Sequence, residues 1–237
     1  MFILNYFCAM QYFNFHTHQH TNQSDVLELV NQYPHEFKAE IPFYSIGIHP
    51  WYIDEERMNS DLQIIESKLQ EKNCFAVGEC GLDKRIEIDF HLQQMVFEKQ
   101  LLLAQKYQKP VVIHCVGTFQ EVIAIKKSLN ITVPMIIHGF SKNEQVAKQL
   151  INNGFYISFG KYLLRNPELE AVFKSIPKDK FFLETDTIEE EIHEVYALAA
   201  KYKGIAIKEI QRQVNLNFET VFKQIEVDKI TNNQSNK

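Results

Sequence analysis

The stretch PVVIHC, residues 110–115, is an apolar run that ends at a histidine, and PMIIHG, residues 134–139, repeats this pattern. Short runs that are apolar almost without interruption are typical of strands buried on both faces, as in a parallel sheet covered by helices. Six further runs of this kind occur along the chain: QYFNF (11–15), VLELVN (26–31), FYSIGI (43–48), FAVGE (75–79), FYISFG (155–160) and FFLET (181–185).

Helical periodicity fills the intervals between the later runs. In residues 54–72, the apolar residues Met58, Leu62, Ile65 and Leu69 recur at the spacing of one helix face. Similar patterns predict helices near 88–108, 117–129, 142–152, 167–175, 189–203 and 214–224. This alternation of strands and helices predicts an α/β fold, and its eight candidate strands favour a TIM-like (β/α)8 barrel.

The first third of the chain leaves little room for helices. The runs at 11–15, 26–31 and 43–48 follow one another closely, so we expect the barrel to be compact or irregular there. An open, doubly wound sheet is the alternative architecture. The sequence has no Gly-rich phosphate loop after its first strand, which weakens a dinucleotide-binding sheet and favours the barrel.

Composition narrows the class of protein. The 237 residues include 45% hydrophobic and 23% charged residues, which is ordinary for a globular protein. The net charge of −5 provides no global basic field for nucleic acid, so polyanion binding would need a local patch or bound metal. The cysteines form neither a CxxC pair nor a disulfide framework, which fits a reducing cytosol. They are Cys8, Cys74, Cys80 and Cys115.

We expect a single barrel domain over residues 11–226, preceded by an N-terminal extension (1–10) and followed by a polar tail (227–237). The extension is apolar, but it is too short to span a bilayer and lacks the basic flank of a signal peptide. Translation could start at Met1 or at Met10. We therefore expect a cytoplasmic protein with no membrane association and no obligate protein partner.

Histidines and carboxylates gather where the candidate strands end. The carboxyl ends of all strands in a barrel meet at one face, which is where barrel active sites lie. His16 and His18 are two residues apart, so on a strand their side chains point to the same side and could face one ion. The set at the strand ends comprises His16, His18, His49, Glu79, His114, His138 and Asp186.

Each of these residues also has an ordinary structural interpretation. Glu79 could form an ion pair with Lys84 or Arg85, and Asp186 could cap a helix that starts near Ile188. A carboxylate that ends an apolar strand is costly to bury unless it is paired or bound to metal. The convergence of the whole set therefore favours metal ligands over separate structural roles.

The other histidines and cysteines divide into expected ligands and residues with a structural role. His114 and His138 could each be a core histidine, but their matched settings, VVIHC and MIIHG, favour ligands. Cys80 and Cys115 alternate away from the expected ligand face and are interpreted as packing residues. Three histidines on loops or helices are interpreted as structural: His35, His91 and His193.

Taken in order, the motifs HTH, GIHP, VGECGLD, VIHC, IIHGF and ETD resemble those of the TatD family of metal-dependent hydrolases. The resemblance runs from about Tyr12 to Phe222. Each motif is weak alone, but six in order, each at a strand end, are specific. The resemblance implies a barrel of the amidohydrolase superfamily and a hydrolase that acts on ester or phosphodiester bonds, as TatD-type deoxyribonucleases do on DNA.

The resemblance also implies roles for individual residues. His16 and His18 match the first metal-binding pair, Glu79 the carboxylate that bridges two divalent ions, and Asp186 the catalytic aspartate that also binds metal. His114 and His138 match the two later histidine ligands. The implied cofactors are two divalent metal ions (Mg, Mn or Zn), and the implied substrate is single-stranded DNA or an oligonucleotide.

Four positions are expected near the substrate or behind the ligands: Asn14, His20, His49 and Glu184. Asn14 stands where relatives usually carry aspartate, and His20 stands where relatives tend to carry aspartate. After Asp186, relatives commonly have a longer loop with prolines, an aromatic residue and an arginine, whereas this chain has the acidic segment 187–191. The ligand set is complete, and the substrate is the open question.

Three hypotheses follow. The first is a DNA phosphodiester hydrolase, supported by candidate basic residues at the mouth: Lys84, Arg85, Lys142, Lys161 and Arg165. The second is a hydrolase of a small-molecule amide, ester or phosphoester, motivated by the acidic loop and the net negative charge. The third is a metal-free scaffold that binds a partner, which would require all six ligands to be relics.

Overall fold

The computed structural model describes residues 12–222, and eight parallel strands form its centre, in the order β1 to β8. The sheet closes where Thr17, at the end of β1, bridges in parallel to Asp186 beyond β8. The (β/α)8 barrel predicted from the sequence is therefore confirmed. The strands are β1 (Tyr12–Thr17), β2 (Val26–Gln32), β3 (Tyr44–Ile46), β4 (Cys74–Asp83), β5 (Val111–Val116), β6 (Met135–Ile137), β7 (Phe155–Phe159) and β8 (Phe181–Leu183).

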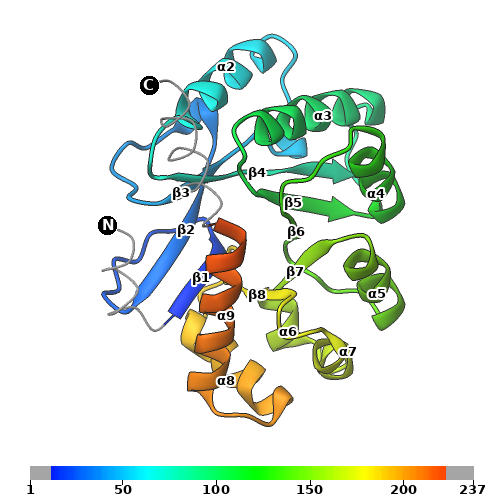
Figure 1. The fold of residues 1–237 in the computed structure, drawn as a ribbon. Coiled ribbons are helices and arrows are strands. Elements are labelled where there is room, and N and C mark those ends of the chain that lie inside the picture. Colours follow the sequence, from blue (N-terminus) through cyan, green and yellow to red (C-terminus); the bar gives the residue numbers. More distant parts are fainter. Residues whose placement is uncertain (1–11, 223–237) are drawn as a thin grey trace, which may run out of the picture.

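Helices surround the strands (Figure 1). Within the described residues, no α-helix precedes Met58, so the first third is irregular, as expected, and contains only the short 3-10 turns η1 (Pro34–Glu36) and η2 (Pro50–Tyr52). The α-helices are α2 (Met58–Lys68), α3 (Phe90–Lys106), α4 (Phe119–Ser128), α5 (Glu144–Asn152), α6 (Lys161–Arg165), α7 (Leu169–Ser175), α8 (Ile192–Lys203) and α9 (Ile207–Phe222).

Two helices differ from the sequence predictions. The pattern of apolar residues predicts the last helix only from 214, but α9 starts at Ile207. Helix α6 was not predicted, because its five residues are too few to show helical periodicity.

The end of the barrel opposite the strand carboxyl ends is closed by α9. Phe218 of α9 packs edge-on against Phe13, near the start of β1, with ring centroids 4.6 Å apart. Phe222 also contacts Phe13 and Phe75, the latter near the start of β4. Apolar side chains thus fill this end, and the polar residues are left to the other end.

Residues 1–10 and 227–237, the expected extension and tail, lie outside the described residues. Within residues 12–222, none of the helices combines the length and the apolar character that a bilayer crossing requires.

Candidate metal centre

The site is built at the carboxyl ends of the strands, where two irregularities in strand pairing reorient side chains. The register between β1 and β2 shifts between Asn14 and Thr17, the segment that carries His16. The register between β4 and β5 shifts between Val77 and Cys80, the segment that carries Glu79. Such irregularities are common beside active sites, where they aim a side chain away from the regular pleat.

The sequence predicted that the fourth strand ends at Glu79, and this boundary is wrong. Strand β4 continues to Asp83, so Glu79 lies in its middle. Glycines make this path possible: Gly81 has φ +150°, and a Cβ atom there would lie 1.9 Å from the backbone oxygen of His114. Strands β4 and β5 therefore approach each other closely at Gly81 and His114.

Glu79 is the centre of the site. Its side chain is buried, and its Oε1 lies 2.8 Å from Nε2 of His138, 3.0 Å from Nδ1 of His114 and 3.1 Å from Nε2 of His49. The second oxygen, Oε2, lies 3.3 Å from Nε2 of His16 and 3.5 Å from Nε2 of His18. The alternative pairing of Glu79 with Lys84 or Arg85 is not what the structure shows.

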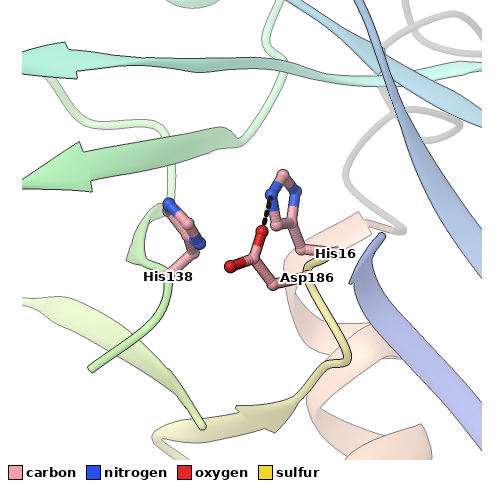
Figure 2. Close-up of side chains that lie close together, drawn as sticks. All are labelled: His16, His138 and Asp186. Carbon is pink, nitrogen blue, oxygen red and sulfur yellow. Dashed lines mark ion pairs between the residues drawn. The ribbon is translucent and has the colours of Figure 1, made fainter. Parts of the chain in front are cut away.

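Asp186 faces the same histidines from the end of β8. Its Oδ1 lies 3.4 Å from Nε2 of His18 and 3.8 Å from Nε2 of His16. Figure 2 shows the pair formed with His16, with His138 beside it. The backbone N–H groups of Thr185 and Asp186 donate to the carbonyl of His16, and the N–H of His18 donates to the carbonyl of Asp186. Asp186 does not cap a helix, because α8 begins at Ile192 and its N-cap is Glu191. The hydrogen bonds that close the barrel thus also fix Asp186 beside His16.

Asn14 supports this junction rather than the histidine rings. Its Nδ2 donates to Oγ1 of Thr185 at 2.9 Å, and its Oδ1 accepts from the N–H of Thr185 at 3.1 Å. Both groups are buried. Asn14 therefore holds β1 to the residue before Asp186, which explains an amide at this position.

The electrostatics of the cluster follow from burial and close opposite charges. Burial alone would raise the pKa of Glu79, but His138, His114 and His16 hold it well below its ordinary value. Burial alone would lower the pKa of His18, but Asp186 and Glu79 outweigh it and raise this pKa to about 9. For Asp186, burial is again opposed by histidines, chiefly His18, and the pKa falls to about 2. Both carboxylates are thus ionised at neutral pH.

His49 differs from the other rings because burial dominates and lowers its pKa, despite the opposing effect of Glu79. Its Nδ1 accepts a hydrogen bond from the backbone N–H of Trp51 at 3.1 Å. The ring is therefore a neutral imidazole whose proton is on Nε2, directed at Glu79.

The donor set fits divalent cations. Both ring nitrogens of His16 are buried without a hydrogen-bond partner among the described residues, although Nε2 faces two carboxylates. A buried nitrogen in this setting is explained by a cation that it would bind. Imidazole and carboxylate ligands together suit zinc, manganese and iron. Three groups bring their ligand atoms within 4.8 Å of one another: His16, His138 and Asp186; His16, His18 and Glu79; and His49, Glu79 and His114.

Two residues that contact this centre, Asp83 and Trp51, were not predicted from the sequence. Oδ2 of Asp83 lies 3.1 Å from Nε2 of His114 and accepts a hydrogen bond at 2.8 Å from Nε1 of Trp51. Asp83 is the last residue of the VGECGLD motif, four residues after Glu79. This position in the motif was the only local sign that Asp83 could belong to the site, because β4 extends as far as Asp83. Trp51 follows GIHP directly and was not singled out.

Of the four positions expected near the ligands, His49 and Glu184 lie beside the cluster. Glu184 is buried; its Oε1 accepts a hydrogen bond from the N–H of Gly139 and lies 3.6 Å from Nδ1 of His138. His20 instead has its Nδ1 2.8 Å from the buried carboxylate of Glu28 and belongs to none of the three ligand groups. His20 is therefore engaged with strand β2 rather than with the centre.

The basic residues expected at the mouth divide into two kinds. Lys84 pairs with Glu121, and Arg165 pairs with Glu190 of the acidic loop. Within residues 12–222, the other three, Arg85, Lys142 and Lys161, form no ion pair, and Arg85 is exposed. Two of the five cations are thus neutralised by the protein itself.

The chain resembles known proteins in sequence. A metal-dependent hydrolase of Haemophilus influenzae, described as uncharacterized, is 34% identical over 155 residues, which cover 61% of this chain and 58% of that protein. The aligned part thus spans less than two thirds of that relative. A second relative is a TATDN1 homolog of Enterocytozoon bieneusi, which is named as a candidate deoxyribonuclease. It is 33% identical over 184 residues, which cover 72% of this chain and 65% of that protein.

The fold has a close structural counterpart. The crystal structure of YJJV, a TatD homolog from Escherichia coli K12, superposes with a TM-score of 0.77 at 21% identity, covering 91% of this chain and 99% of that one. The sequence model of the family described as TatD related DNase matches residues 9–223. The chain therefore belongs to the TatD-related DNase family.

Proposed function

We propose that this protein is a divalent-metal-dependent hydrolase that cleaves phosphodiester bonds of DNA. The observation that carries the proposal is the Glu79 carboxylate, buried among five histidines, with the unpartnered nitrogens of His16 beside it. The family match and the deoxyribonuclease name of one relative support DNA as the substrate class. Metal dependence is supported by the names of other relatives.

The proposed site would hold two ions. His16, His18 and Asp186 would hold the first ion, His114 and His138 the second, and Glu79 would lie between the two. Divalent ions bound here would supply positive charge opposite a phosphoryl group and lower the pKa of a water toward roughly 7. Mg²⁺, Mn²⁺ and Zn²⁺ are the candidate ions.

Two side chains of the protein, Asp186 and His49, would position groups and protons at the site. The Asp186 carboxylate is ionised at neutral pH, and its backbone is fixed to His16, so it is positioned to orient an attacking water and to take its proton. His49 carries its proton on Nε2, and this N–H group faces Glu79 and offsets part of the negative charge of Glu79.

The free cysteines fit a reducing compartment. Cys74, Cys80 and Cys115 are all free. Cys74 and Cys80 are buried, and burial raises the pKa of Cys74 to about 12, so this group remains an inert thiol. We propose a cytoplasmic location on this ground.

The test is hydrolysis of a single-stranded oligonucleotide with titrated Mg²⁺ or Mn²⁺. Wild-type protein should cleave it, and both Glu79→Ala and Asp186→Asn should abolish cleavage. Wild-type cleavage no greater than that of these two variants would reject a deoxyribonuclease.

A hydrolase of small molecules is the second candidate. A hollow formed partly by the residues just after Asp186 in the sequence has three glutamates and two basic residues in its lining, and its arginine is already paired with Glu190. It is lined by Lys161, Arg165, Thr187, Ile188, Glu189, Glu190 and Glu194. A panel of chromogenic esters and phosphodiesters separates the two candidates, because activity confined to oligonucleotides excludes the second.

A further inference from the structure

Exposed aromatic rings lie beside the candidate metal centre. Trp51 is 53% exposed and Tyr52 is 43% exposed, although large aromatic side chains are usually buried. Both belong to η2, directly after His49. The Trp51 ring lies edge-on to the rings of His49 and His114, with centroids 5.1 Å and 5.9 Å away. An exposed indole thus touches two rings of the centre.

The Trp51 ring is held in one orientation. Its Nε1 donates to Oδ2 of Asp83 at 2.8 Å, and the same oxygen lies 3.1 Å from His114. The other oxygen of Asp83 accepts from the backbone N–H of Arg85 at 2.8 Å. A ring fixed in this way loses little conformational entropy when a flat ligand stacks on it.

More rings continue this surface. Tyr52 lies edge-on to Tyr33 with centroids 5.1 Å apart, and Tyr33 stacks on His35 at 5.8 Å. The hydroxyl of Tyr33 lies 3.4 Å from Nδ1 of His18. We name Tyr33, His35, Trp51 and Tyr52 the aromatic platform; it contacts the proposed ligands at two points, His18 and His114.

We propose that the aromatic platform is a nucleobase-binding subsite in which Trp51 stacks on a base next to the scissile phosphate of single-stranded DNA. The proposal rests on the proposed function for the phosphate's place at the centre. Stacking needs a base that is free of its partner strand, which is why the substrate would be a single strand or an unpaired end.

The charges around the mouth support stacking as the main source of affinity. The protein carries a net charge of −5, and Lys84 and Arg165 are already paired with carboxylates. Few phosphates can therefore be neutralised by free cations, which limits the electrostatic part of binding. Arg85 is exposed and follows Asp83, so it is the cation placed to meet the strand beside Trp51.

Trp51 makes a direct test available, because it is the only tryptophan in the chain. Asp186→Asn protein in Mg²⁺ is titrated with an oligothymidylate and with a strand of the same length in which every base is removed. The base-containing strand should quench the fluorescence of Trp51, and the abasic strand should bind about 10-fold more weakly, as expected for loss of one stacked base. No quenching, together with equal affinity for the two strands, would overturn the subsite.

Kinetics of active protein separate stacking from the hydrogen bond to Asp83. Trp51→Ala should raise KM for the oligonucleotide about 10-fold with little change in kcat. Trp51→Phe, which keeps a stacking ring but lacks the N–H group, should retain most of the affinity. Leu216→Ala, an exposed apolar residue on α9, is the matched control and should leave KM unchanged. Equal defects in Trp51→Phe and Trp51→Ala would assign the effect to the hydrogen bond and contradict stacking.

The outcomes for the subsite and for the proposed function are distinct. Quenching without hydrolysis by wild-type protein would retain the subsite and reject the deoxyribonuclease. Hydrolysis with neither quenching nor discrimination against the abasic strand would retain the deoxyribonuclease and reject the subsite.

Discussion

Asp83 connects the substrate side of the centre to its ligand side. A histidine that binds a metal through one ring nitrogen usually donates its other N–H to a carboxylate or carbonyl, which fixes the ring. In this protein Nδ1 of His114 faces Glu79, and Nε2 faces Asp83. Asp83 is therefore a positioning residue for His114.

Replacing Asp83 by alanine should weaken metal binding. The Nε2 atom of His114 would lose its partner, and affinity for Mn²⁺ should fall about 10–100-fold, as when other carboxylates behind metal-bound histidines are removed. Titration of chelator-treated protein with Mn²⁺ measures this change. Trp51→Phe is the matched control, because it removes the other donor to Oδ2 of Asp83 but leaves the contact with His114. Unchanged affinity in Asp83→Ala would show that His114 needs no such support.

At the scale of elements, strand β4 decides the geometry of the site. It is ten residues long, carries Glu79 in its middle and Asp83 at its end, and is buried throughout. Because Gly81 lies against the backbone of His114, a larger residue there must push β4 and β5 apart.

Gly81→Ala should destabilise the protein and disturb the centre together. The new methyl group would meet the His114 carbonyl, and we expect a loss of about 3 kcal/mol in the free energy of unfolding, the upper range for overpacking. Gly154→Ala is the control: that glycine also has positive φ, but a Cβ atom there meets nothing within 4 Å. It should cost about 1 kcal/mol and leave metal binding intact. Thermal unfolding and Mn²⁺ titration of both variants check this, and equal effects would contradict the close approach.

The sequence was sufficient to find the eight strands, apart from the end of β4, and to pick out the residues that surround Glu79, because uninterrupted apolar runs and polar strand ends are local features. The sequence was insufficient where the role of a side chain depends on a partner that lies far away along the chain. The sequence predicts only that Asn14, where relatives usually carry aspartate, lies near the substrate or behind the ligands; its partner is Thr185, which only barrel closure brings near. Asp83 was missed because β4 does not end at Glu79, and Trp51 because nothing local links it to Asp83.

For the whole molecule, the cluster links stability to pH. In metal-free protein, the pKa of His18 is raised from 6.5 to about 9 despite burial, mainly by Asp186, so its contribution to stability is complete below pH 6.5 and is lost as the pH rises through 9. The pKa of Asp186 is lowered from 3.8 to about 2, so its contribution is present above pH 3.8 and is lost as the pH falls through 2. These two groups therefore favour the range between pH 3.8 and 6.5.

Bound metal should reverse the upper part of this dependence. A metal needs the neutral imidazole, so protons compete with it less as the pH rises. The increase in Tm caused by Mn²⁺, relative to protein in chelator, should therefore grow between about pH 6 and pH 8, while Tm in chelator falls. Thermal unfolding in both conditions measures it. A Tm increase that is independent of pH would show that histidines do not bind the ion.

The central claim is that Glu79 and the surrounding histidines form a two-metal centre. The most direct measurement is elemental analysis of protein that has been stripped with chelator, reloaded with Mn²⁺ and freed of excess ion, for wild type and Glu79→Gln. We predict two ions per chain in the wild type and fewer than one in Glu79→Gln, which keeps the side-chain volume and removes the shared charge. A wild type without stoichiometric metal, or a Glu79→Gln variant that retains both ions, would contradict the account.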